Sequence, residues 1–176
     1  MIDQIEMKVD PTSENTIKYE LSISDTKTRS KPFLPNVSNI PSSVKYQLML
    51  YKKLFDKLVQ GVIDDVKIFQ TLNLDPDLEF SNELANIIKI SYQEKEFKPN
   101  LQNLIKIVMS RFENFCKSSN ILEVNYKFQK DGNDLGSLYF EYDENQIEDY
   151  LKKSAEYWKG DRNPEGVPIE EAGRCR

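Results

Sequence analysis

An alternation of apolar and polar side chains near the N-terminus constrains the fold of this chain most. Between positions 17 and 24 the odd positions carry Ile17, Tyr19, Leu21 and Ile23, and the even positions carry Lys18, Glu20, Ser22 and Ser24. A repeat of two residues is typical of a half-buried β-strand, because successive side chains point to opposite faces of a sheet.

Two charged residues continue the apolar parity of this strand. Asp25 and Lys27 occupy the positions that should point inward. A buried charge is costly unless it is paired or binds a metal ion, so the strand end is a candidate functional site. The alternative is that the strand ends at Ser24 and that both charges are solvated, as surface charges usually are.

The remaining sequence predicts a mixed α/β architecture. A first strand at 2–9 should pair antiparallel with a second at 16–28, and a hairpin should join strands at 121–130 and 137–143 around the turn 131–136. Helical spacing indicates helices at 42–61, 81–92, 100–117 and 145–159, the last ending near Gly160. We expect another strand around 63–72, and a proline-rich loop at 30–41 that lies over the site.

Composition excludes several classes of function. The sequence contains no histidine, which excludes Ser-His-Asp catalysis, Cys-His catalysis and His-ligated zinc within this chain. Its net charge of −5 argues against nucleic-acid binding through bulk positive charge, although a local basic groove is compatible with it. No apolar run reaches about 18 residues, so we expect no membrane span. We also expect no signal peptide, because Met1 leads almost directly into strand-like sequence.

Two side chains on the 42–61 helix are further candidates. Gln47 and Tyr51 are one turn apart and therefore share a face. The helix follows the strand of Asp25 and Lys27 across the proline loop, so both side chains could line the same cleft. The alternative is a satisfied polar residue beside a core aromatic residue.

The two cysteines cannot form a disulfide framework. We expect Cys116, in the 100–117 helix, to be a small buried apolar residue. Cys175 lies in a terminal loop and by itself indicates nothing.

The motifs together resemble a known family. Ile2-Asp3, Asp25-Thr26-Lys27-Thr28-Arg29 and Gln47-Leu48-Met49-Leu50-Tyr51 follow the motif order of RecB-like PD-(D/E)XK nucleases. The form D-x-K-T-R followed by Q-L-M-L-Y resembles the exonuclease V family, which are single-strand-specific DNA exonucleases with an iron–sulfur cluster. The segment 157–172, followed by Cys175-Arg176, resembles the stretch that precedes the clustered cysteines of that family.

The resemblance implies a fold and a domain organisation. It implies an α/β, restriction-endonuclease-like PD-(D/E)XK core, a mixed sheet flanked by helices and truncated at both ends. Residues 1–176 would form a single partial nuclease domain. Its catalytic strands and Q-x-x-x-Y helix would lie in 1–61, a helical and hairpin part in 62–160, and the start of the iron–sulfur cysteine segment in 161–176.

The resemblance also implies catalytic roles. Asp3 and Asp25 would ligate Mg²⁺ or Mn²⁺ with the Thr26 carbonyl. Lys27 would orient or deprotonate the attacking water and stabilise charge on the phosphate.

Other residues would serve the substrate. Gln47 and Tyr51 would position the scissile phosphate or the lysine. Arg29 would contact a DNA phosphate, although a solvated surface arginine is an equal alternative. Phe33 could stack on a base, although the commoner role is an apolar loop anchor.

Cys175 would be one ligand of a [4Fe–4S] cluster. The family pattern expects further cysteines beyond Cys175, an upstream cysteine and a helix before Asp3, and a tryptophan where Gly173 stands. We therefore expect a piece of a longer protein that builds the cluster only at full length. For the isolated chain we expect low stability and little or no activity.

These inferences predict a monomeric, metal-dependent exonuclease on single-stranded DNA, in DNA repair or mitochondrial genome maintenance, with a mitochondrial location. The nucleus or cytosol is the alternative location. Two other functions stay open: another RecB-like nuclease that acts on duplex ends or RNA, and a non-catalytic interaction module in which Asp25 and Lys27 form an ordinary ion pair.

Overall fold

The computed structural model describes residues 4–9, 19–92, 98–166, 169 and 172. They fall into two compact units. The sheet unit comprises Met1–Leu54 and Ser118–Arg176, and the helical unit comprises Phe55–Lys117. The combination of helices with a mixed sheet confirms the predicted α/β class. The PD-(D/E)XK core stays a prediction, as does the division of the domain into the parts 1–61, 62–160 and 161–176.

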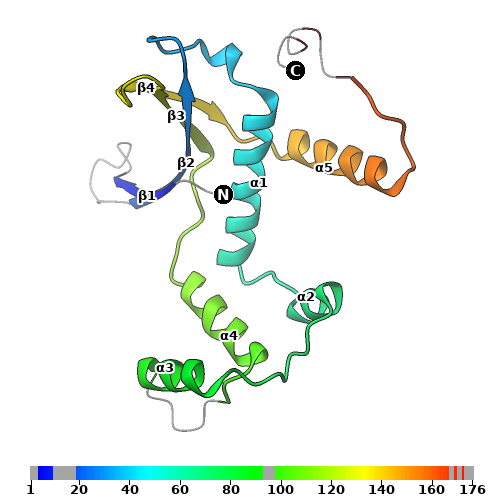
Figure 1. Ribbon diagram of the computed structural model, residues 1–176. Helices are drawn as coiled ribbons and strands as arrows, with labels where there is room; N and C mark the ends of the chain where they lie inside the picture. The colour runs from blue at the N-terminus through cyan, green and yellow to red at the C-terminus, as the bar shows by residue number, and fades with distance from the viewer. Residues whose placement is uncertain (1–3, 10–18, 93–97, 167–168, 170–171, 173–176) are drawn as a thin grey trace. The chain divides into compact units, whose positions relative to one another are not determined.

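The described strands of the sheet unit form one sheet in the order β1-β2-β3-β4 (Figure 1). β1 (Gln4–Val9) pairs antiparallel with β2 (Tyr19–Arg29), which confirms the first predicted pairing. β3 (Ile121–Phe128) and β4 (Asp134–Glu141) form the predicted hairpin. β2 and β3 run parallel, with Asp25 opposite Val124 and Lys27 opposite Tyr126.

The register sorts the side chains of β2 and β3 between two faces of the sheet. Paired residues share a face, so Ile23, Asp25 and Lys27 lie with Leu122, Val124 and Tyr126. The other face carries Ser22, Ser24 and Glu123. β2 has neighbours on both sides, and both its apolar and its polar positions from Leu21 to Asp25 are buried.

Helix α1 (Ser42–Val59) begins in the sheet unit. Its Leu48 and Met49 are buried with the apolar residues of the sheet and of helix α5 (Glu144–Lys159). α1 and α5 contact one another through the stacked rings of Tyr46 and Tyr150, 4.1 Å apart. Burial of this apolar surface stabilises the unit, whose core includes Leu21, Ile23, Leu48, Met49, Leu122, Val124, Leu138 and Ile147.

Helix α5 ends as the sequence predicts. Asp143 caps its N-terminus by accepting a hydrogen bond from the backbone N–H of Gln146. Gly160 ends it with a φ of 84°, a left-handed conformation that glycine adopts without steric cost. The loop 30–41 is also confirmed, and it contains a short 3-10 helix at Val37–Asn39.

The helical unit contains helices α2 (Asp65–Leu72), α3 (Asn82–Tyr92) and α4 (Leu101–Phe112). The strand expected around 63–72 is wrong, because this segment is α2. The side chain of Asp64 accepts from the N–H of Lys67 at 2.9 Å, and Asn73 closes the other end at φ 51°. These two caps favour one helix over an extended run.

Helix α4 is shorter than predicted, and this corrects the interpretation of Cys116. The helix ends at Phe112, and the chain turns through a hydrogen bond from the N–H of Phe115 to the carbonyl of Phe112. Cys116 lies beyond the helix and its thiol is exposed rather than buried. Three aromatic rings cluster next to this turn: the ring centre of Phe55 lies 6.1 Å from that of Phe112 and 6.2 Å from that of Phe115.

In the part of the chain that the structure describes, no helix is long and apolar enough to cross a membrane.

Candidate functional site at the end of strand β2

Asp25 occupies the inward position that the strand parity predicted. It is only 2% exposed, beside the fully buried Ile23 on the same face. Its Oδ2 lies 2.6 Å from the Nζ of Lys27, two residues further along the strand. A carboxylate this deeply buried requires a counter-charge, and Lys27 supplies it. The alternative of two solvated charges after Ser24 is wrong, because β2 continues to Arg29.

Lys27 links the strand to helix α1. Its Nζ lies 3.4 Å from Oε1 of Gln47, and Nε2 of Gln47 donates to the hydroxyl of Tyr51 at 3.1 Å. The side chain of Lys27 is 32% exposed, in contrast to 3% for Asp25. The ammonium group therefore has a buried anion on one side and access to solvent on the other.

The local structure explains why these four residues meet. Alternation along β2 puts Asp25 and Lys27 on one face, and the helical repeat puts Gln47 and Tyr51 on one face of α1. The structure thus brings together Asp25, Lys27, Gln47 and Tyr51, as predicted. The catalytic roles given to them stay predictions.

Lys52, a lysine that helical spacing does not mark as buried, holds α1 in place. Lys52 is 3% exposed, and its Nζ donates to the backbone carbonyl of Ser118 at 2.8 Å and to its hydroxyl at 3.3 Å. Ser118 lies just before β3 and forms an isolated parallel β-bridge with Leu21 of β2. Lys52 therefore positions the helix that carries Gln47 and Tyr51. Helical spacing offered no signal, since a lysine next to Lys53 resembles a solvated pair.

A cavity of about 520 Å³ opens beyond the end of β2. Arg29, Lys31, Phe33, Leu34, Asn36 and Tyr126 are among its lining residues. The guanidinium carbon of Arg29 lies 5.0 Å from the ring centre of Phe33. Tyr126 is opposite Lys27 in the β2–β3 pairing, so the cavity adjoins the Asp25–Lys27 pair. Sequence reasoning missed Tyr126, although its parity on β3 was a usable signal.

Two predicted site residues cannot be compared with the structure. Asp3 and Cys175 lie outside the described residues. Within the described part, no group of three or more His, Cys, Asp or Glu side chains could hold a metal ion. The Asp25 carboxylate is nevertheless the kind of hard oxygen donor that Mg²⁺ or Mn²⁺ prefers.

An acid–lysine pair at a strand end, linked to a helical Gln and Tyr beside a basic cavity, defines a candidate site for phosphate chemistry. The sequence matches the family model described as "Exonuclease V - a 5' deoxyribonuclease" over residues 2–99 and 86–176. The chain therefore belongs to the exonuclease V family.

Individual relatives agree with this family. Exonuclease V of Danio rerio is 31% identical over 160 residues, which cover 90% of this chain and 40% of the zebrafish protein. "Exonuclease V, mitochondrial" of Saccharomyces cerevisiae S288c is 31% identical over 112 residues, covering 60% of this chain and 19% of the yeast protein. The chain thus spans well under two thirds of the length of these relatives.

Proposed function

We propose that the protein is a metal-dependent exonuclease that hydrolyses the phosphodiester bonds of single-stranded DNA, on a PD-(D/E)XK core. The family description as a 5' deoxyribonuclease supports DNA as the substrate. The observation that carries the proposal is the position of Lys27, whose ammonium lies between the buried carboxylate of Asp25 and the amide of Gln47.

The proposal includes a divalent metal ion. Asp25, with Asp3 and the Thr26 carbonyl, would hold Mg²⁺ or Mn²⁺ through oxygen atoms. When bound, such an ion lowers the pKa of a coordinated water and neutralises charge on the phosphate.

The protein's own side chains would orient the reaction. Lys27 holds its ammonium within reach of both Asp25 and solvent, so it can donate to a phosphate oxygen that gains charge or to the attacking water. Gln47 accepts from Lys27 and donates to Tyr51, which fixes the rotamer of the lysine. Pre-positioning of this kind lowers the barrier because no reorganisation is needed during the reaction.

The remaining parts of the proposal concern the whole protein. Cys175 would be one thiolate ligand of a [4Fe–4S] cluster whose other ligands come from elsewhere in a full-length protein. The yeast relative is named mitochondrial, and we extend this location, and a monomeric state, to this protein. Imaging of the tagged protein beside a mitochondrial dye, and size-exclusion chromatography with light scattering, test these two points.

Cleavage and metal binding test the proposal together. The assay measures the shortening of end-labelled single-stranded DNA in the presence of Mg²⁺. It uses the longest protein that carries this sequence. We expect Lys27→Ala to lower cleavage by about 10²- to 10³-fold, and Lys53→Ala, a lysine of α1 outside the site, to retain it. Calorimetry with Mn²⁺ should show binding that Asp25→Asn weakens. Full cleavage by Lys27→Ala would instead favour an ordinary ion pair, and preference for duplex ends or RNA would favour another RecB-like nuclease.

A further inference from the structure

We propose that the cavity beyond β2 binds one unpaired nucleotide of the substrate strand, with the base stacked on Phe33 and the phosphate held by Arg29 and Lys31. This inference rests on the proposed function for the identity of the ligand as single-stranded DNA. It assigns Phe33 as a residue that determines strand specificity.

The exposure of Phe33 is the first support. Its side chain is 56% exposed although it lines a concave site. The sequence favoured an apolar loop anchor, and this interpretation is wrong because an anchor would be buried. A large apolar ring left open to solvent in a cavity is suited to a planar, apolar ligand.

The cations around the ring are the second support. Arg29 and Lys31 lie 5.0 Å and 6.0 Å from the centre of the Phe33 ring. An aromatic ring next to positive charges is the combination that binds single strands, because every base has a π-face and every nucleotide carries a phosphate.

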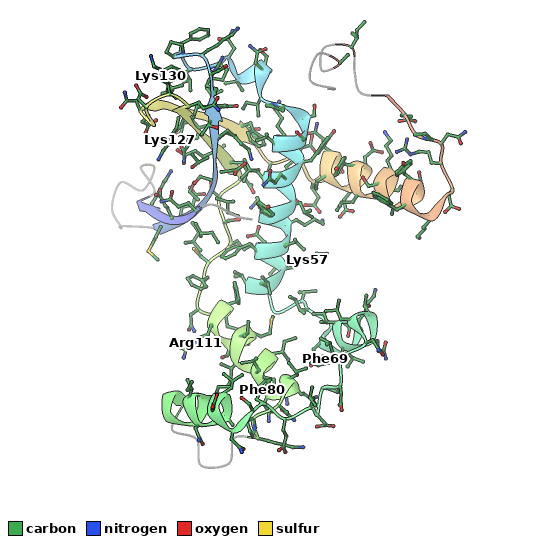
Figure 2. All side chains as sticks on the ribbon, in the orientation of Figure 1. Lys57, Phe69, Phe80, Arg111, Lys127 and Lys130 are labelled. Atoms are coloured by element: carbon green, nitrogen blue, oxygen red, sulfur yellow. The ribbon has the colours of Figure 1, made fainter. Side chains whose placement is uncertain are left out.

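The local charge is the third support. The segment 26–43 contains Lys27, Arg29 and Lys31 and no acidic residue, in a chain whose net charge is −5. The β3–β4 turn is attached to this segment by a hydrogen bond from the N–H of Gln129 to the carbonyl of Arg29, at 2.8 Å. Figure 2 shows Lys127 and Lys130 at this same end of the sheet.

The two acids of that turn, Asp131 and Asp134, offset the charges of Lys127 and Lys130, so the positive charge next to the cavity is that of the segment 26–43. Oδ1 of Asp131 accepts from the N–H of Asn133, and Oδ1 of Asp134 accepts from the N–H of Gly136. Both carboxylates therefore serve to close the turn.

The position of the cavity fits a strand that continues from the cleavage site. Arg29 lies two residues beyond Lys27 on the same face of β2, which is about 6.6 Å along the strand. A nucleotide at Phe33 would thus be a near neighbour of the phosphate at Lys27. A base inside a duplex has both faces covered by its neighbours and cannot stack on a protein ring without leaving the stack, so this site favours single strands.

A binding assay without catalysis tests the inference. Oligodeoxynucleotides that contain 2-aminopurine are titrated with protein in EDTA, so that no cleavage occurs. We expect binding to quench the 2-aminopurine fluorescence. Phe33→Ala should raise Kd roughly 5- to 100-fold and remove the quenching. Phe33→Tyr keeps an aromatic ring and should keep both the affinity and the quenching. Arg29→Ala should raise Kd and reduce the slope of log Kd against log salt by about 1.

Matched controls make the outcome decisive. Trp158→Ala removes an aromatic residue that is 83% exposed on α5, and it should bind as the unmodified protein does. Equal unfolding midpoints for the Phe33 variants exclude a loss of folding. Undiminished binding and quenching by Phe33→Ala, or an equal loss on duplex DNA, would overturn the inference. Because the assay excludes cleavage, failure of the proposed nuclease activity appears separately, in the Lys27 experiment.

Discussion

The two faces of the central sheet each contain a buried carboxylate paired with a lysine, and the pairs differ in what surrounds them. Asp25 pairs with Lys27 of its own strand, and Lys27 also contacts Gln47 of α1. On the opposite face, Glu123 is 6% exposed and lies 2.5 Å from Lys8 of β1.

The surroundings of Glu123 are those of a structural ion pair. Its other oxygen accepts from the hydroxyl of Tyr139 at 3.2 Å. Burial raises the pKa of Glu123, but hydrogen bonds from Lys8, Ser137 and Tyr139 outweigh it and leave the pKa below its ordinary 4.5. Burial also lowers the pKa of Lys8, yet Glu123 brings it above 10.5. Each partner therefore stabilises the charged form of the other.

The comparison teaches that burial of an acid–lysine pair does not by itself mark a functional site. The Lys8–Glu123 pair joins β1 to β3 across the sheet and stabilises the fold. The Asp25–Lys27 pair joins neighbouring positions of one strand, contacts a polar helix face and adjoins a cavity. Variants of each pair should separate these roles.

The largest expected effect is on cleavage by Lys27→Ala. Removal of a cation aimed at a phosphate should lower kcat by about 10²- to 10³-fold. The free energy of unfolding should fall as well, because the buried Asp25 loses its counter-charge, so kcat is the quantity that separates this pair from a purely structural one. Single-turnover assays on end-labelled DNA and denaturant unfolding provide the two measurements. A large loss of stability with unchanged kcat would make this pair structural as well.

The next effect is on stability, from Lys8→Met. It leaves the buried Glu123 without its counter-charge, and we expect a loss of about 2 kcal/mol, reduced from the cost of a fully buried pair because Lys8 is 41% exposed. Urea unfolding at pH 7 measures it. Glu123→Gln serves as the matched control and should cost less, because it removes the buried charge itself.

The same pair predicts a pH dependence. Because the folded pKa of Glu123 lies below 4.5, its contribution is present above the unfolded value and is lost as pH falls through the folded pKa. At the alkaline end, the contribution of Lys8 is present below 10.5 and is lost as pH rises through its raised folded pKa. Unfolding free energies from about pH 6 to 3 should decline less steeply in Lys8→Met. An identical decline would contradict the assignment.

A smaller effect is expected from Gln47→Ala. It removes the amide that lies between Lys27 and Tyr51, so the lysine loses a positioning contact while its charge remains. We expect kcat to fall about 10-fold, equivalent to about 1.4 kcal/mol of barrier, with a small change in KM. Restoration by Gln47→Asn is not expected, since the shorter side chain cannot span both partners.

The smallest effect should come from Lys53→Ala. Lys53 forms ion pairs with Glu144 and Glu148, and both acids are more than half exposed. Solvent screens such pairs, so we expect a loss of about 0.5 kcal/mol in unfolding and no change in cleavage. A loss of cleavage would mean that contact between α1 and α5 controls the site.

Sequence patterns predicted the local elements well. The alternation before Asp25 predicted β2, the Asp131–Gly136 turn predicted the hairpin, and Gly160 predicted the end of α5. The sequence patterns failed at 63–72, where a short segment is compatible with either a strand or a helix. They also failed before Cys116, where the helix ends at Phe112 although the helical pattern continues.

The candidate site was predictable in part because its members follow two short periodic elements. The parity of β2 identified Asp25 and Lys27, and the repeat of α1 placed Gln47 with Tyr51. Residue type was a poorer guide to burial on α1, since Leu54 is 51% exposed and Lys52 is buried. The residues around Lys52 in the sequence do not predict its hydrogen bond to Ser118, because the two residues are 66 positions apart.

The sequence by itself determined which strand ends in an acid and a lysine and which helix face carries Gln47 and Tyr51, because side-chain periodicity is a property of neighbouring residues. Only the tertiary structure decided that β2 lies parallel to β3, that Tyr126 meets Lys27, and that Phe33 stays exposed beside Arg29. These features depend on contacts between residues far apart in the chain, and burial and partner distance arise only when the chain has folded.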